Sequence, residues 1–184
     1  VNYMAARYGL PLGPATRYNR PGMPYDVAGI GQVAFYDQHL DAQGRGVVRM
    51  KDASDMEDGE FLMWGHDGGT LTWDETGYPI TSAHVNRTWA FEQTGEVGMV
   101  EVRIYAPELA DGLSEVGLLV SNTPNFEAGV LPEFIAVTNE GDYIVAMVDF
   151  EGSGVFTLGV PPTVGIENLD YANISIYPNP VDQM

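Results

Sequence analysis

The chain of 184 residues contains no cysteine. This absence excludes disulfide frameworks, thiolate zinc sites, iron–sulfur clusters and cysteine nucleophiles. Basic residues are also scarce, since 8 Lys and Arg stand against 26 Asp and Glu, for a formal charge of −18 at pH 7. Nucleic-acid binding depends on clustered Lys and Arg that neutralise phosphates. We therefore expect no nucleic-acid partner.

Long hydrophobic runs are missing as well. No apolar stretch approaches the ~20 residues that a membrane-spanning helix requires, so we expect no membrane insertion. The first residues, Val1 to Met4, show neither a signal peptide nor an initiator methionine. We therefore expect the chain to be a piece of a longer precursor.

The residues that are present favour a folded, all-β protein. Hydrophobic residues make up 45% and aromatic residues 11% of the chain, which is enough for a core. The 22 glycines and 12 prolines are too many for a helical bundle and are typical of short strands joined by tight turns. The expected fold is an antiparallel β-sandwich of jelly-roll or immunoglobulin-like type, with a short N-terminal helix and an extended C-terminal tail.

Strand-length apolar stretches recur between turn signals. They are residues 25–30, 46–50, 60–64, 85–93, 98–105, 115–121, 133–138, 143–150, 154–158 and 174–177. Alternation is clearest in 99–105, where Glu101 and Arg103 should face solvent and the residues between them the core. Hairpins are predicted around residues 94–96, 139–142 and 151–154, because each contains a glycine suited to a tight turn.

The chain divides into four predicted regions. Residues 1–12 hold a helix and its exit, read as the tail of an upstream region. Residues 13–159 form the sandwich. The Pro/Gly-rich segment 10–24 is expected to be an extended connector rather than a helix or strand. Residues 160–172 are a Pro-rich linker. Residues 173–184 contain one more strand pattern.

The last region resembles a known export signal. Tyr177, Pro178, Asn179 and Pro180 follow a short alternating strand, and together they resemble the opening of the C-terminal sorting domain of the type IX secretion system of Bacteroidota. The resemblance implies recognition by that translocon and a secreted or cell-surface location. Most of such a sorting domain is absent from this sequence.

Residues 1–158 are similar to a Bacteroidota surface domain of unknown function that precedes such sorting domains. The similar pieces are residues 1–12, 25–31, 61–69, 87–95 and 141–159. The resemblance implies an adhesin-like surface protein, and it brings no catalytic residues.

One acidic segment is a candidate calcium site, with Asp52, Asp55, Glu57 and Asp58 as ligands, because calcium binds clustered carboxylate oxygens. The spacing does not fit an EF-hand loop. The alternative is a solvated acidic loop. No other cofactor is indicated.

Other side chains give weaker indications. His66 and Asp67 are adjacent, so on a strand they point to opposite faces, and a turn is a better interpretation than a catalytic pair. Trp73 and Tyr78 lie between strands and are the candidate glycan contacts, whereas Trp64 and Trp89 should be core. No catalytic motif is present.

The sequence thus predicts a non-catalytic module of an exported surface protein, acting in adhesion or as a structural spacer. Two alternatives stay open. One is a self-assembling filament subunit whose tail adds a strand to another copy. The other is a carbohydrate-binding or carbohydrate-active domain, in which surface glycans are the partners.

Overall fold

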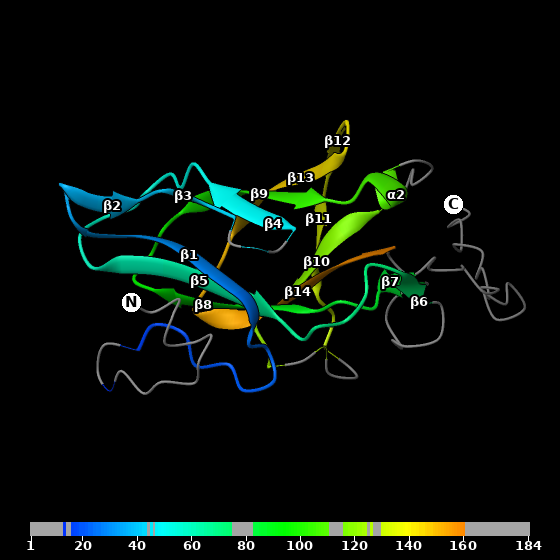
Figure 1. Cartoon of the computed structure of the whole chain (residues 1–184), viewed down its shortest axis with the longest axis horizontal. Coiled ribbons are helices and arrows are strands. Elements are labelled where there is room, and N and C mark those ends of the chain that lie inside the picture. Colours follow the sequence, from blue (N-terminus) through cyan, green and yellow to red (C-terminus); the bar gives the residue numbers. More distant parts are fainter. Residues whose placement is uncertain are drawn as a thin grey trace, which may run out of the picture.

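The computed structural model describes residues 13, 16–43, 45, 47–74, 83–110, 116–124, 126 and 130–160. Two antiparallel sheets pack face to face in this part of the chain (Figure 1). The nine-stranded sheet contains β1 (Tyr25–Ala34), β2 (Asp37–His39), β5 (Glu60–His66), β6 (Trp73–Asp74), β7 (Ala83–Val85), β8 (Trp89–Thr94), β10 (Gly117–Ser121), β11 (Glu133–Ala136) and β14 (Ser153–Val160). The five-stranded sheet contains β3 (Asp41–Ala42), β4 (Val48–Lys51), β9 (Met99–Tyr105), β12 (Thr138–Glu140) and β13 (Tyr143–Asp149).

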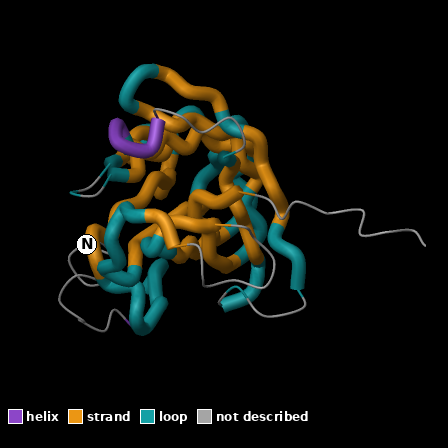
Figure 2. The backbone as a smooth tube through the Cα atoms, turned by 90° about the vertical axis from the view of Figure 1, so that its right-hand side faces the viewer, coloured by secondary structure: helices purple, strands orange, loops and turns teal. Residues whose placement is uncertain are grey.

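The predicted antiparallel β-sandwich is confirmed. Apart from the short helix α2 (Pro107–Ala110), the described residues are strands and loops (Figure 2). Within them, no helix has the length and the apolar character to cross a membrane. The predicted N-terminal helix and the strand at 174–177 lie outside the described residues.

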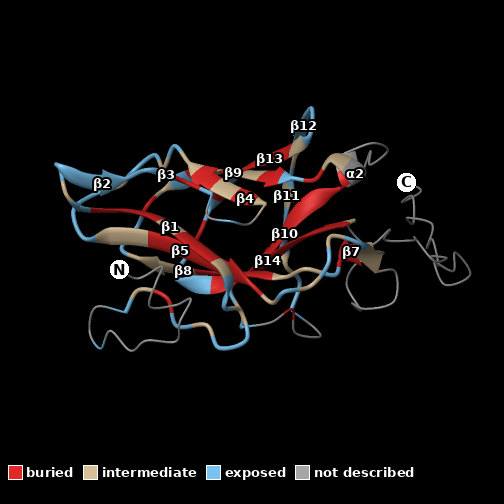
Figure 3. Cartoon of the chain, in the orientation of Figure 1, coloured by how far each residue is buried: buried red, intermediate tan, exposed pale blue. Residues whose placement is uncertain are grey.

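The core lies between the two sheets (Figure 3). Trp64 and Trp89 are both buried there, as predicted. The Phe150 ring lies 4.6 Å from the Phe91 ring and 5.8 Å from the Phe156 ring, measured between centroids, so the aromatic side chains fill the interior as one cluster. In β9 the buried and less buried positions alternate as the sequence predicted.

Two of the predicted hairpins are wrong. Gly95 and Gly152 do have positive φ, at 76° and 62°, as tight turns require. The strands that they connect, however, belong to different sheets: β8 and β14 lie in the nine-stranded sheet, and β9 and β13 in the five-stranded sheet. Of the three predicted turns, only the one at Gly141 joins strands that are hydrogen-bonded to each other, β12 and β13. The two other turns carry the chain across the sandwich.

Short strands form the edges of both sheets. At one side β2 ends the nine-stranded sheet and β3 ends the five-stranded sheet, one residue apart in sequence. At the other side β11 and β12 do the same. The predicted strand at 133–138 is therefore two strands in two sheets. Such short edges leave few unpaired backbone groups for another strand to join.

The predicted strand at 85–93 is interrupted at residues 86–88. On either side of the break, β7 and β8 pair with the same strand, β14. The fully buried Thr157 of β14 lies beside the break, and its Oγ1 donates to the carbonyl of Arg87 at 2.8 Å and approaches that of Val85 at 3.3 Å. A hydroxyl group thus occupies the gap in the backbone ladder.

Residues 16–24, here called the strap, pack against the outer face of the nine-stranded sheet, below β5 and β8 in Figure 1. Tyr18 is buried there, and its hydroxyl donates to the Met23 carbonyl at 2.7 Å. The Arg20 guanidinium donates to the Gly154 carbonyl at 3.0 Å. Gly65 leaves the space, because a Cβ there would lie 2.6 Å from the Tyr18 hydroxyl. As predicted, these residues contain no helix or strand, and in addition they cover part of the outer face of the sheet.

Candidate functional site

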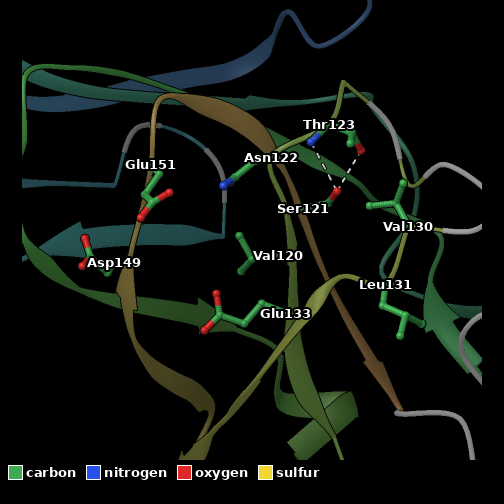
Figure 4. A pocket seen from close by; sticks show the side chains of 9 residues that line it. All are labelled: Val120, Ser121, Asn122, Thr123, Val130, Leu131, Glu133, Asp149 and Glu151. Atoms are coloured by element: carbon green, nitrogen blue, oxygen red, sulfur yellow. Dashed lines mark hydrogen bonds between the residues drawn. The ribbon is translucent and has the colours of Figure 1, made fainter.

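A cavity of about 540 Å³ opens at the edge of the sandwich (Figure 4). It lies where β10 ends, β11 begins and the chain passes from β13 to β14. Its lining residues are Val120, Ser121, Asn122, Thr123, Val130, Leu131, Glu133, Asp149 and Glu151. Most of these residues are exposed, so the cavity is open to solvent.

The walls of the cavity differ in chemistry. Glu133, Asp149 and Glu151 lie on one side in Figure 4, and Val130 and Leu131 lie on the other. Between them, the Ser121 hydroxyl accepts a hydrogen bond from the Thr123 amide at 3.3 Å and shares one with its hydroxyl at 2.8 Å. The cavity can therefore contact a ligand that has both a charged and an apolar part.

An aromatic turn projects from another part of the sandwich. Phe35 and Tyr36 form the two-residue turn between β1 and β2, flanked by the pair Ala34 and Asp37. Their exposed fractions are 79% and 91%. Neither has the positive φ of the turns usually found in two-residue hairpins, which favour Asn-Gly. Large aromatic residues in such a position differ from the polar residues usual in a solvated turn.

The predicted turn at His66 and Asp67 is displaced, because β5 continues to His66 and the chain bends only at Gly68. His66 belongs to a hydrogen-bonded cluster. The Gly68 amide donates to His66 Nδ1 at 2.9 Å, so the imidazole carries its proton on Nε2, which lies 3.0 Å from an Asp26 carboxylate oxygen. The Tyr25 ring stacks on the imidazole at 5.7 Å. His66 thus pairs with a carboxylate distant in sequence, while Asp67 accepts from the Gly69 amide at 2.8 Å.

Arg87 joins this cluster to the interruption between β7 and β8. Its Nε donates to the Gly69 carbonyl at 2.7 Å. Burial lowers the pKa of Arg87, and the nearby carboxylates of Asp26 and Asp67 act in the opposite direction. Both ring nitrogens of His66 are occupied by protein groups, which indicates a structural role for the cluster rather than proton transfer to a substrate.

The four predicted calcium ligands do not converge. The Asp52 carboxylate accepts from Lys51, and Asp58 accepts from Gln32 at 2.7 Å. Asp55 and Glu57 lie in the same loop, on the way to β5. Among the described residues, no group of three or more His, Asp or Glu side chains could hold a metal ion. The structure gives the calcium hypothesis no support in this part of the chain.

The other predicted contacts are divided between described and undescribed residues. Trp73 lies in β6, half-buried against the core, so only part of its ring is available to a glycan. Tyr78 lies outside the described residues, as do Tyr177, Pro178 and Asn179 and the final proline of that motif, Pro180. The sequence did not indicate the cavity, because its residues come from segments far apart in the chain.

The fold defines the molecule as a two-sheet antiparallel β-sandwich, with an open cavity at its edge. A family model matches residues 44–153, more than half of the chain, and the chain belongs to that family, DUF8202, a domain of unknown function. The match begins before β4 and ends at the start of β14, so the folded unit is larger than the matched segment. No curated protein and no solved structure matches the chain.

Proposed function

We propose that this chain is a non-catalytic adhesion module of an exported bacterial surface protein. The observation that carries the proposal is the exposed aromatic turn, Phe35 and Tyr36, at the tip of a hairpin whose first strand is fixed in the sheet by β5. A rigid scaffold that displays aromatic side chains is suited to binding a surface, since aromatic residues dominate interface energetics.

Export belongs to the same proposal. The resemblance of Tyr177, Pro178, Asn179 and Pro180 to a sorting-domain opening supports passage through the type IX translocon of a Bacteroidota cell and a location at the cell surface. The filament alternative is less favoured, because the edge strands of both sheets are short.

Adhesion of the purified chain tests the proposal. Beads that carry the chain are applied to three surfaces: mucin, collagen and a phosphatidylcholine bilayer. We expect retention on at least one surface, weakened at least about tenfold in the double variant Phe35→Ser, Tyr36→Ser, because buried aromatic anchors carry most of an interface's binding energy. Since both side chains are exposed, the variant should keep its fold, which circular dichroism checks.

The control removes exposed apolar side chains elsewhere. Met99 and Met147 lie on the outer face of the five-stranded sheet, with exposed fractions of 39% and 45%. The double variant Met99→Ser, Met147→Ser should bind like the original chain. Failure of the chain to adhere to any of the surfaces, or equal losses in both variants, would instead leave the module as a structural spacer.

A further inference from the structure

The start of β1 holds an exposed tyrosine ring in a fixed position. Tyr25 pairs with His66 across β1 and β5, and the two rings stack with their centroids 5.7 Å apart. Gly68 has a φ of 85°, and a Cβ there would lie 2.9 Å from the Tyr25 ring, so a glycine at this position makes room for the ring. Tyr25 is nevertheless 55% exposed. The protein thus supports a ring that a ligand can still reach.

The next residue carries a carboxylate that is also fixed. The register shifts between Tyr25 and Ala28, and Asp26 has a φ of 48°, which residues other than glycine seldom adopt. Such bulges re-aim a side chain, and such backbone strain is concentrated at functional sites. One Asp26 oxygen lies 3.0 Å from Nε2 of His66, whose side chain is 5% exposed, whereas that of Asp26 is 33% exposed. A buried imidazole therefore orients a carboxylate that solvent can reach.

Arg87 adds hydrogen-bond donors to the same place. Its side chain is half-buried near the carboxylates of Asp26 and Asp67, and its Nε donates to the Gly69 carbonyl at 2.7 Å. The two oxygens of Asp67 accept from the amides of Gly69 and Thr88, at 2.8 and 3.3 Å. In the part of the chain that the structure describes, neither the terminal N–H groups of Arg87 nor the second oxygen of Asp26 has a hydrogen-bond partner. Both are therefore available to a ligand.

The balance of charge decides which kind of ligand fits. A cation that approaches Asp26 meets the guanidinium of Arg87, and an anion that approaches Arg87 meets the carboxylates of Asp26 and Asp67. A neutral hydroxyl group avoids both repulsions, because it can donate to a carboxylate and accept from a guanidinium. A ring that carries several hydroxyl groups and has an apolar face would also cover the exposed Tyr25 ring. A sugar ring has all of these features.

We propose that Tyr25, Asp26 and Arg87 form a binding site for a neutral sugar ring. The apolar face of the sugar stacks on Tyr25, while its hydroxyl groups donate to Asp26 and accept from Arg87. The same chemistry occurs in a free monosaccharide and in a sugar unit of a glycan. Tyr25 begins β1, whereas the aromatic turn follows the other end of that strand, so the site does not depend on the adhesion proposal.

Chemical shifts of the full chain test the site. The probes are glucose, galactose and mannose, each free and as its methyl glycoside, at concentrations up to about 50 mM, a range that detects weak binding. Butylammonium chloride and sodium butyrate are the charged controls. We expect the Gly68 backbone amide and the Tyr25 ring protons to shift with at least one sugar, and to shift less with either ion. Binding of the free sugar alone indicates a monosaccharide as ligand, and binding of the methyl glycoside indicates a sugar unit of a glycan.

Variants assign the binding to these side chains. Tyr25→Ser removes the stacking surface and Asp26→Asn removes the charge-assisted hydrogen bonds, so each should weaken binding at least about fivefold. Tyr25→Phe keeps the ring and should bind within about twofold of the original chain. Asparagine tolerates a positive φ, so Asp26→Asn should keep the backbone, which the amide spectrum checks.

The control variant removes the same kinds of group elsewhere. Tyr105 is an exposed tyrosine of β9, and Asp142 is an exposed acid between β12 and β13. The double variant Tyr105→Ser, Asp142→Asn should bind sugar like the original chain. The absence of shifts with every sugar, larger shifts with either ion, or equal weakening in this control would each overturn the proposal, whatever the outcome of the adhesion assay.

Discussion

The hydroxyl group of Thr157 is predicted to stabilise the interrupted region between β7 and β8. Its side chain is fully buried, and its Oγ1 lies 2.8 Å from the Arg87 carbonyl and 3.3 Å from the Val85 carbonyl. The variant Thr157→Val keeps the volume and the β-branched shape of the side chain, so strand propensity is nearly unchanged. What it removes is the only donor that this side chain offers to those carbonyls.

The expected cost follows from the geometry. The Thr157 hydroxyl has one proton, so it donates to one carbonyl at a time, and the shorter contact is the 2.8 Å one with Arg87. Loss of this hydrogen bond leaves the partly buried Arg87 carbonyl without this donor. Such a loss costs about 1–3 kcal/mol in the free energy of unfolding. For a domain of this size the melting temperature should fall by about 2–4 °C for each kcal/mol.

Chemical denaturation monitored by tryptophan fluorescence measures the change. The control variant Thr157→Ser keeps the donor and loses one methyl group, which costs about 0.8 kcal/mol or more according to the cavity left. Hydrogen exchange should show faster opening at the Asn86 and Thr88 amides in Thr157→Val than in Thr157→Ser. A valine variant within about 0.5 kcal/mol of the original chain would refute the reasoning, since it would fall within the range of a neutral substitution.

Two further predictions concern the strap and the buried histidine. The variant Gly65→Ala should release the strap, because the new Cβ would lie 2.6 Å from the Tyr18 hydroxyl and 2.7 Å from the Met23 carbonyl. Proteolysis within residues 16–24 should accelerate markedly, whereas the midpoint of global unfolding should fall only slightly. An unchanged rate of proteolysis would contradict this. Burial lowers the pKa of His84 against the opposing effect of Asp74, so the unfolded chain takes up a proton near pH 6.5 while the folded chain stays neutral to lower pH. The free energy of unfolding should therefore fall as the pH drops from 7 to 5.5, by at most about 1.4 kcal/mol per pH unit from this group, and the variant His84→Gln should lessen that slope.

The fold class was predictable because it depends on local patterns. The alternation in β9 and the glycine turns are signals that neighbouring residues provide. The partners of the strands are not encoded locally. Gly95 and Gly152 indicate that the chain reverses, but whether the next strand pairs with the last one or crosses to the other sheet depends on contacts with distant strands.

The strap and the cavity show the same limit more clearly. Tyr18 lies in a segment rich in proline and glycine, and only the space above Gly65, more than forty residues away, makes it a core residue. Glu133, Asp149 and Glu151 have no common spacing and converge only through the topology. The aromatic turn carried no sequence signal, because Phe35 and Tyr36 are not residues that favour turns.

The distribution of charge limits which partners this molecule can approach. Among the described residues, the ion pairs between basic side chains and carboxylates include Arg49, Lys51 and Arg103, which lie on β4 and β9. Arg20 and Arg87 donate to backbone carbonyls, and Arg87 also lies near the carboxylates of Asp26 and Asp67. With 26 Asp and Glu against 8 Lys and Arg, most carboxylates have no basic side chain available to pair with.

An acidic partner would be repelled over a distance of about 8 Å at physiological salt. Contact through uncharged side chains avoids much of that repulsion. The aromatic turn offers such side chains at the end of a hairpin, where approach does not require the acidic faces to come close. If the adhesion proposal holds, added salt should therefore strengthen binding at the turn, because screening lessens the repulsion between the acidic faces and an acidic partner.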